Sequence, residues 1–278
     1  MKVLARRILR QFGLEVRRIP FWGSSGPTVR RDSLQGLLEH VRGLGFSPNS
    51  VIDAGAACGT FSSQCHAIFP DAHYLLIEPL MEYLPSIKKV VSVIPRATYE
   101  IAAVASQEGR ASCNVHHDLV GSSLYQEAEE GSDIDGVRRE VRTITLDRLV
   151  GERQATPPYL IKIDVQGAEL DVLAGGEKTL ENAEYVLLEV SLFHFFKQGP
   201  VFCDVVAYMK ARGFVPYDIY ELQYRPLDHA LSQVDIAFVK EDGQFRKFHH
   251  YATPEQRAEQ NREFKSYLVG LLSSEPGK

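Results

Sequence analysis

The sequence lacks the features that mark membrane proteins, secreted proteins and proteins with paired cysteines. No apolar run approaches the roughly 18 residues that a membrane-spanning helix needs. Residues 1–14 lack the uninterrupted apolar core of a signal peptide. Among the 278 residues there are only four cysteines, and no two of them form a C-x-x-C pair. We therefore expect a cytoplasmic protein whose thiols are reduced.

A large net charge is also missing. The formal net charge is −5 and the pI is about 6.0, so no global basic field indicates a nucleic-acid partner. The exception is local, because residues 1–50 carry nine Lys or Arg against three acidic residues. Within them, residues 2–12 predict a short helix with apolar side chains on one side and arginines on the other. Such a helix either makes weak contact with an anionic membrane surface or is simply solvated.

Apolar runs with the character of buried strands alternate with segments of helical spacing. The predicted strands lie near residues 51, 74–77, 99–105, 159–165, 185–190, 214–222 and 234–239. This alternation predicts an α/β fold with a mostly parallel, doubly wound sheet of seven strands and right-handed crossovers. No helix separates the last two strands, so we expect them to form an antiparallel edge.

The first strand leads into a turn of small residues, Asp53-Ala-Gly-Ala-Ala-Cys-Gly59, and then into a predicted helix. Small residues allow a sharp turn and let a ligand approach the backbone, close to the N–H groups that begin the helix. The second strand ends in Glu78, which lies 19 residues beyond Gly59. An acidic residue at this distance is typical of a carboxylate that binds a ribose diol. The pattern therefore predicts a nucleoside site.

The spacing of the glycines favours S-adenosylmethionine as that nucleoside. A dinucleotide site requires G-x-G-x-x-G, whereas here Gly55 and Gly59 are separated by three residues and Ala57 stands near the second position. Asp53 would repel a phosphate but suits a cation or a hydroxyl. An NAD-dependent oxidoreductase is the weaker alternative. A non-catalytic domain that serves as a binding or scaffold protein is a third possibility.

Three further segments complete the predicted organisation. Residues 106–140 break the periodicity, which indicates a lid, a binding loop or disorder. Residues 253–272 predict a helix with a capping box at Thr253 and Gln256 and one apolar stripe. We expect this stripe to pack on the domain, with a homodimer contact as the alternative. The boundaries are then a basic segment over 1–27, the main domain over 28–242 and a C-terminal amphipathic helix over 243–278.

The run Leu160-Ile-Lys-Ile-Asp-Val-Gln-Gly-Ala-Glu-Leu170 resembles the signature of the FkbM-type S-adenosylmethionine-dependent methyltransferases. Thr145-Leu-Asp147, Leu188-Glu-Val190 and the turn after residue 51 are similar to that family too, over about residues 28–240. The resemblance implies a class I methyltransferase, Rossmann-like fold and O-methylation of a hydroxyl on a sugar, glycan or natural product. It places Asp164 toward the transferred methyl group.

We predict that the cofactor contacts Asp53, Gly55, Ala56, Gly59, Phe61, Glu78, Pro79, Ala103 and Asp164. For Ala103 and its neighbour Ala102, tight packing is an equal alternative to an adenine wall. A hydroxyl is weakly acidic, so its methylation calls for a base or a metal near the ends of the fourth and fifth strands.

The catalytic candidates are Asp164, Glu189 and His194. Asp164 has a helix N-cap as its alternative role, and Glu169 in the following turn is explained by the helix dipole. Glu189 lies in an apolar strand, where an unpaired carboxylate would be costly, so we expect it to have a function or a specific partner. His194 titrates near neutral pH and is a candidate base, with an aromatic-packed loop position as the alternative. We predict no dedicated metal site, and we leave a cation held by these three candidates as a minority possibility.

Overall fold

The computed structural model describes residues 29–129 and 136–273, and it describes the side chains of the last helix as far as Val269. The chain divides into two units, residues 1–30 and residues 31–278, and the elements below belong to the second unit. The helix predicted over residues 2–12 lies outside the described residues.

The elements follow one another as α2 (Leu34–Gly43), β1 (Ser50–Ala54), α3 (Thr60–Ile68), β2 (His73–Ile77), η1 (Met81–Tyr83), α4 (Leu84–Val93), β3 (Ala97–Glu100), β4 (Ala103–Val104), β5 (Gly109–Val115), β6 (Val137–Ile144), α6 (Leu146–Glu152), β7 (Tyr159–Ile163), α7 (Glu169–Ala174), α8 (Glu177–Glu181), β8 (Ala183–Ser191), α9 (Phe202–Lys210), β9 (Phe214–Tyr224), β10 (Leu231–Lys240), η2 (Gln244–Arg246) and α10 (Pro254–Ser273).

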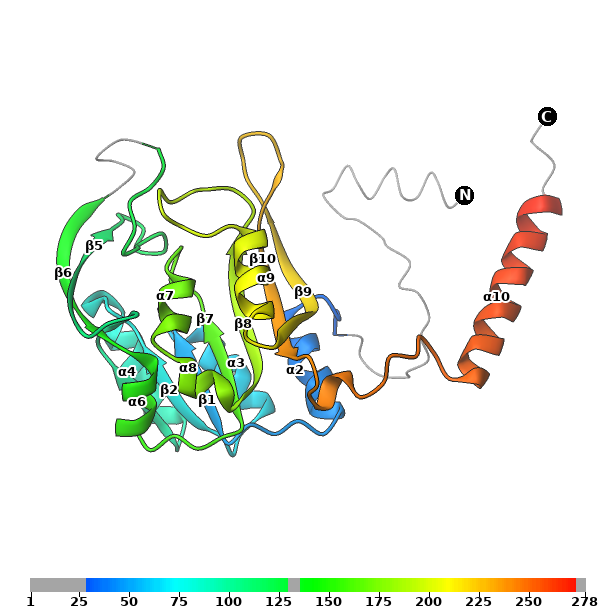
Figure 1. Cartoon of the computed structure of the whole chain (residues 1–278), viewed down its shortest axis with the longest axis horizontal. Helices are drawn as coiled ribbons and strands as arrows, with labels where there is room; N and C mark the ends of the chain where they lie inside the picture. Colours follow the sequence, from blue (N-terminus) through cyan, green and yellow to red (C-terminus); the bar gives the residue numbers. More distant parts are fainter. Residues whose placement is uncertain (1–28, 130–135, 274–278) are drawn as a thin grey trace. The chain divides into compact units, whose positions relative to one another are not determined.

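Seven of the described strands form the main sheet, in the order β3-β2-β1-β7-β8-β10-β9 (Figure 1). The pairs from β3 to β8 are parallel, whereas β10 is antiparallel to both β8 and β9. The short turn between β9 and β10 leaves no room for the long crossover that a parallel pair needs. The predicted doubly wound, mostly parallel sheet of seven strands with an antiparallel edge is therefore confirmed, and the antiparallel strand of the edge pair lies one position inside the edge.

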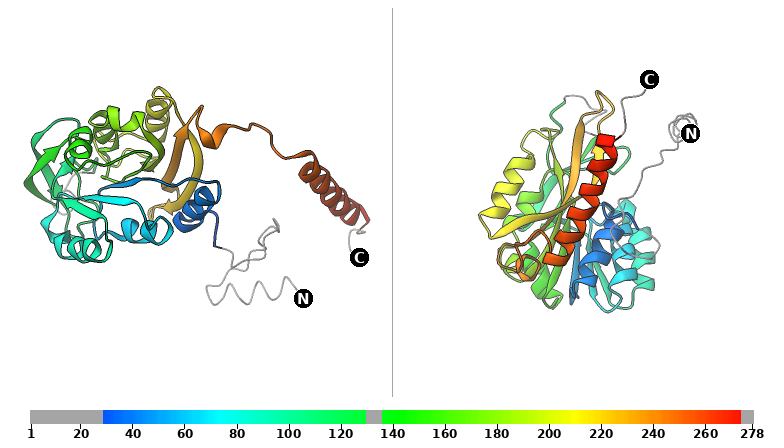
Figure 2. Two further views of the ribbon diagram at one scale, coloured as in Figure 1. Left: turned by 90° about the horizontal axis from the view of Figure 1, so that it is seen from below. Right: turned by 90° about the vertical axis from the view of Figure 1, so that its right-hand side faces the viewer.

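Helices cover both faces of this sheet (Figure 2). On one face, α2, α3 and α4 bury apolar side chains against alternate residues of the strands, such as Val51 and Tyr74. On the other face, α6, α7, α8 and α9 pack against the remaining set, which includes Ile52 and Leu75. Strands buried on both faces read as continuous apolar runs, which is why the sequence made them easy to predict.

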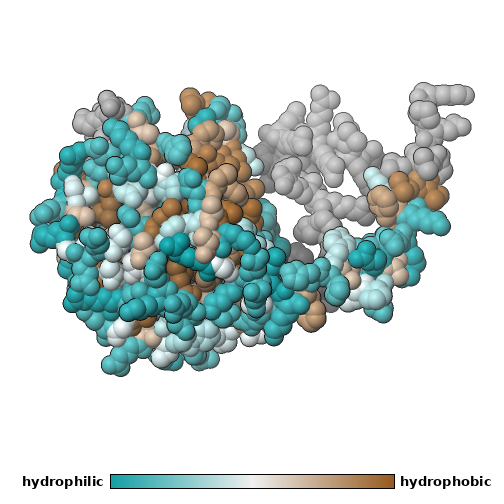
Figure 3. Space-filling view, in the orientation of Figure 1, coloured by the Kyte–Doolittle hydropathy of each residue, from teal (hydrophilic) through white to brown (hydrophobic). Residues whose placement is uncertain are grey.

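The expectation of an irregular excursion over residues 106–140 is wrong in part. Its beginning forms β5 and its end enters β6, and these two strands build a second sheet in the order β4-β6-β5. The pattern concealed these strands because β6 exposes charged side chains to solvent, along a surface that is mainly hydrophilic in Figure 3. Only a small apolar face, with Cys113, Val115 and Val141, is buried against Leu80 and Ala103.

The helical segment between β7 and β8 is not continuous, because α7 ends at Ala174 and α8 begins at Glu177. Of the two glycines between them, Gly175 lies against the segment that follows β4 and Gly176 lies against the start of α6. A Cβ at Gly175 would stand 2.2 Å from the carbonyl oxygen of Ala105, and one at Gly176 would stand 2.8 Å from a methyl group of Leu146. Close backbone packing therefore explains the break.

The C-terminal helix α10 begins at the predicted capping box. The Thr253 N–H donates to Gln256 Oε1 at 2.9 Å, and the Gln256 N–H donates to Thr253 Oγ1 at 3.2 Å. In contrast to our expectation, the described part of its apolar stripe does not pack on the domain, since Phe264 and Tyr267 are 63% and 62% exposed. No helix among the described residues is both long enough and apolar enough to cross a membrane.

Candidate active-site cleft

A cleft of about 250 Å³ opens at the carboxyl ends of the parallel strands. Its lining includes residues that follow β1, β2 and β7, residues of β8, β9 and β10, and residues 119–124 of the excursion. In a doubly wound sheet this edge is where ligands bind. The excursion is held over the cleft because Ser123 Oγ donates to the Gln166 carbonyl oxygen at 2.6 Å and Tyr125 OH donates to Asp171 Oδ2 at 2.8 Å.

The turn after β1 is shaped by contact with the neighbouring strand. Gly55 lines the cleft and has φ +82°, and a Cβ there would stand 1.8 Å from the Asp164 carbonyl oxygen. Gly59 has φ +76°, and a Cβ there would stand 3.0 Å from a methyl group of Val90, away from the cleft lining. Glycine is needed at both positions because other parts of the protein approach the backbone closely. The packing of the chain therefore explains these glycines without a ligand.

Glu78 follows β2 and faces the cleft, although it is only 5% exposed. Its two oxygens accept backbone hydrogen bonds, Oε2 from the Ala57 N–H and Oε1 from the Leu80 N–H, both at 2.9 Å. Burial raises the pKa of this carboxyl to about 7, and the two hydrogen bonds oppose that rise. The turn after β1 and the end of β2 are thus joined through one carboxyl group.

Apolar side chains surround the Glu78 end of the cleft. Pro79 and Ala103, two of the predicted cofactor contacts, belong to this lining, and Ala102 lies with them. The second sheet and the excursion add Cys113, Leu119 and Leu124. This part of the wall was not predicted, because it comes from the segment whose pattern indicated a loop.

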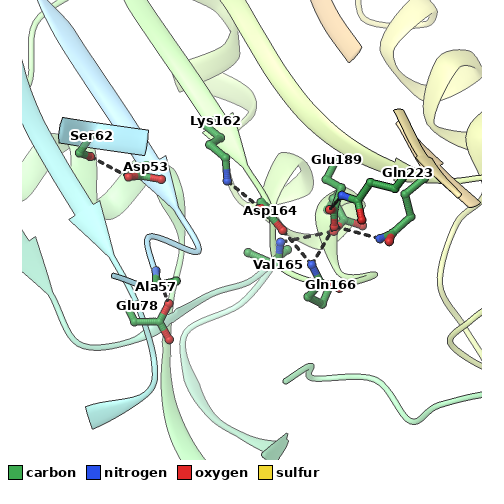
Figure 4. A network of polar contacts seen from close by, with 12 residues as sticks. Asp53, Ala57, Ser62, Glu78, Lys162, Asp164, Val165, Gln166, Glu189 and Gln223 are labelled. Atoms are coloured by element: carbon green, nitrogen blue, oxygen red, sulfur yellow. Dashed lines mark hydrogen bonds and ion pairs between the residues drawn. The ribbon is translucent and has the colours of Figure 1, made fainter. Parts of the chain in front are cut away.

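Three other predicted cofactor residues lie in the core beside the cleft. Asp53 is fully buried, and its Oδ2 accepts a hydrogen bond from Ser62 Oγ at 2.6 Å (Figure 4). Ala56 and Phe61, the second residue of α3, are buried in the core on the face of the sheet that α2, α3 and α4 cover. None of the three belongs to the cleft lining. The three side chains support the turn from the core, outside the cleft lining.

Asp164, the residue after β7, lines the cleft beside a lysine. Lys162 Nζ donates to Asp164 Oδ2 at 2.8 Å, and Gln166 Nε2 donates to Asp164 Oδ1 at 2.9 Å. Burial opposes ionisation, but the lysine and the hydrogen bonds from Gln166 and Glu189 outweigh it and lower the pKa of Asp164. Asp164 does not cap the following helix, because the N-cap of α7 is Ala168.

Glu189 on β8 also lines the cleft and has the specific partners that its position in an apolar strand predicts. Its Oε2 accepts hydrogen bonds from Gln166 Nε2 at 2.7 Å and Gln233 Nε2 at 3.1 Å, and its Oε1 accepts one from Gln223 Nε2 at 3.2 Å. Burial, followed by the nearby Asp164, raises the pKa of Glu189 to about 9. The structure therefore brings Asp164 and Glu189 together, one tending to be ionised and the other to hold a proton.

The three glutamines were not predicted from the sequence. Gln166 lies inside the Lys162-Ile-Asp-Val-Gln run, and its φ of +54° is unusual for a residue with a side chain. Gln223 and Gln233 come from the last two strands, far along the chain. The sequence pointed only to the carboxyl group that they surround, because a Glu within an apolar strand requires hydrogen-bond donors.

His194 and Glu169, which also lie near the ends of β7 and β8 in sequence, do not line the cleft. His194 is exposed after β8, its Nδ1 lies 3.3 Å from the Gly199 carbonyl oxygen, and it is not part of the lining. Glu169 is buried, and its Oε1 accepts hydrogen bonds from the Gly167 N–H at 2.9 Å and the Val165 N–H at 3.4 Å. It fixes the loop that carries Asp164 and Gln166.

More than half of the chain matches a known protein family. The family model described as "Methyltransferase FkbM domain" matches residues 53–216. The hexuronic acid methyltransferase AglP of Haloferax volcanii is 29% identical over 72 residues, which are 26% of this chain and 28% of that protein.

Among solved structures, the methyltransferase FkbM of Methylobacillus flagellatus aligns with a TM-score of 0.44 and 16% identity, over 69% of this chain and 44% of that one. Fibrillarin of Aeropyrum pernix, solved with bound S-adenosyl-L-methionine, aligns with a TM-score of 0.40 and 12% identity, over 74% of each chain.

Proposed function

Because the chain belongs to the FkbM methyltransferase domain family, we propose that it transfers a methyl group from S-adenosylmethionine to a hydroxyl of a sugar, glycan or natural product. The observation that carries this proposal is the Glu78 carboxyl, buried at the end of β2 and turned to the cleft. Its backbone hydrogen bonds leave further lone pairs for the two hydroxyls of a ribose.

The residues of the cleft fit the different parts of this cofactor. The apolar wall beside Glu78, with Ala102, Ala103 and Leu119, suits an adenine ring. The other end of the cleft, with Asp164 and Glu189, suits the positively charged part of the molecule. Among the described residues that line the cleft there is no Lys, Arg or His, and a pyrophosphate would meet only carboxylates and neutral groups. The lining thus favours S-adenosylmethionine over NAD.

When bound, the cofactor supplies an electrophilic methyl group, and the protein's own residues must orient the acceptor and take its proton. We assign proton acceptance to the Asp164–Glu189 pair, because neutral pH leaves at least the Asp164 carboxyl ionised. Lys162 keeps the negative charge on Asp164, and Gln166 bridges the two carboxyls. His194 has no part in this assignment because of its exposed position outside the cleft.

The end of the cleft with Asp164 and Glu189 suits an acceptor molecule that presents a neutral hydroxyl group. Gln166, Gln223 and Gln233 all reach this end, and amide groups both donate to and accept from hydroxyls. The relative from Haloferax volcanii is named for a hexuronic acid. The described lining here lacks a cation that would pair with a carboxylate, so our proposal extends to the hydroxyl and not to the acid group.

Calorimetric titration tests the proposed function. S-adenosylmethionine and S-adenosylhomocysteine are expected to bind, whereas NAD is not. Glu78→Gln should weaken the binding of S-adenosylhomocysteine at least about tenfold, because hydrogen bonds to a charged group contribute about 1.5–3 kcal/mol. Glu82→Gln is the matched control, since Glu82 lies on η1 and pairs with Arg139 at 2.7 Å on the surface. Binding of NAD alone, or no binding of any of the three, would contradict the proposal.

A further inference from the structure

A row of ionisable side chains crosses the cleft end of the main sheet (Figure 4). In the strand registers, Asp53 on β1 lies opposite Lys162 on β7, and Asp235 on β10 lies opposite Glu189 on β8. Asp164 follows β7 directly. Among the described residues, this row sets four carboxyl groups against one ammonium group.

That ammonium group is already engaged by a single carboxylate. Lys162 Nζ lies 2.8 Å from Asp164 Oδ2, and the two side chains are 16% and 29% exposed. Glu189 instead receives its hydrogen bonds from the neutral amides of Gln166, Gln223 and Gln233. Amides hold the carboxyl in place but do not balance a full negative charge, so an ionised Glu189 lacks a cation at hydrogen-bond distance in the described structure.

We propose that Glu189 makes the cleft selective for ligand charge, so that it holds the sulfonium cofactor more tightly than the neutral thioether product. This inference rests on the proposed function, because it assumes that S-adenosylmethionine is the cofactor. A cation beside Glu189 stabilises the ionised carboxylate. Beside a neutral thioether, Glu189 stays protonated. Loss of the positive charge on methyl transfer therefore loosens the product.

The groups that face Glu189 set the direction of its pH dependence. Burial raises its pKa most, followed by the charges of Asp164 after β7, Asp235 on β10 and Glu169 on α7, whereas Lys162 lowers it. Above neutral pH more Glu189 ionises, and its attraction for a cation grows. The preference for S-adenosylmethionine should therefore increase as the pH rises toward about 9, the pKa of Glu189.

The test is calorimetric titration with S-adenosylmethionine and S-adenosylhomocysteine at about pH 6.5 and about pH 9. We expect the ratio of the product Kd to the cofactor Kd to rise about tenfold between these conditions in the wild type. In Glu189→Gln the rise should be much smaller. The amino groups of the ligands also titrate in this range, but they affect the wild type and Glu189→Gln equally. The difference between the two proteins therefore reports on Glu189 alone.

Glu184→Gln is the matched control, because it makes the same exchange at the opposite end of β8, where Glu184 pairs with Lys240. It should behave as the wild type. If both ligands bind the wild type with a ratio that does not change with pH, or if Glu189→Gln shows the same change, the inference is wrong while the proposed function stands. If neither ligand binds the wild type, the proposed function itself fails.

A second measurement does not depend on the folding of a variant. Titrating the wild type in buffers of different ionisation enthalpy gives the number of protons released on binding. Near pH 8 we expect S-adenosylmethionine to release more protons than its amino group accounts for, with Glu189 as their source. If the amino group of S-adenosylmethionine accounts for all the protons that are released on its binding, the inference is wrong.

Discussion

The two ends of the cleft are built in different ways. The Glu78 end is made by segments close together in sequence, and backbone N–H groups of Ala57 and Leu80 fix its carboxyl group. The Glu189 end is assembled from β7, β8, β9 and β10, and side-chain amides fix its carboxyl group. Backbone donors persist in any variant that keeps the turn, whereas each amide can be removed alone. Single substitutions can therefore remove the donors of the second end one at a time, whereas the first end keeps its donors.

The largest effect is expected from Asp164→Asn, which removes the ionised member of the carboxyl pair. Turnover should fall roughly 10²–10⁴-fold, the usual range for a general base, while the Kd for S-adenosylhomocysteine changes much less. Ser106→Ala, at an exposed position, should leave turnover unchanged. An Asp164 variant with nearly normal turnover would remove this residue from the mechanism.

Gly55→Ala tests whether the two ends depend on each other for their shape. The new Cβ would stand 1.8 Å from the Asp164 carbonyl oxygen, so the turn after β1 must move away from the loop after β7. Gly45→Ala is the control, because Gly45 has φ +89° with no atom within 4 Å of the added Cβ. Urea denaturation should show a loss of roughly 1–2 kcal/mol for the control, from its left-handed backbone, and a clearly larger loss for Gly55→Ala. Equal losses would show that the close approach does not matter.

The smallest effect concerns pH. A folded Glu189 with a pKa of about 9 keeps a proton that the unfolded chain releases near pH 4.5, so its contribution to stability falls as the pH rises between these values. The free energy of unfolding should therefore fall less steeply from pH 7 to pH 9 in Glu189→Gln than in the wild type. The difference is at most about 1.4 kcal/mol per pH unit. Parallel curves for the two proteins would show that Glu189 is ionised in the free enzyme.

The same contrast explains what the sequence alone could predict. Glu78 was found because the glycine turn and the acid after the next strand lie within one short stretch. Glu189 was found because a carboxyl group in an apolar strand is unusual. Gln223 and Gln233 could not be found, since their amides gain meaning only when β9 and β10 fold beside β8. His194 was placed in the site on its chemistry, but the loop after β8 turns it to solvent.

The most direct test is a crystal structure of the protein grown with S-adenosylhomocysteine. The ribose hydroxyls should lie within hydrogen-bond distance of Glu78, with the adenine ring against Ala102 and Ala103 and the sulfur toward Asp164 and Glu189. A cleft that stays filled by the protein's own side chains, or a nucleoside bound away from Glu78, would contradict the proposed function.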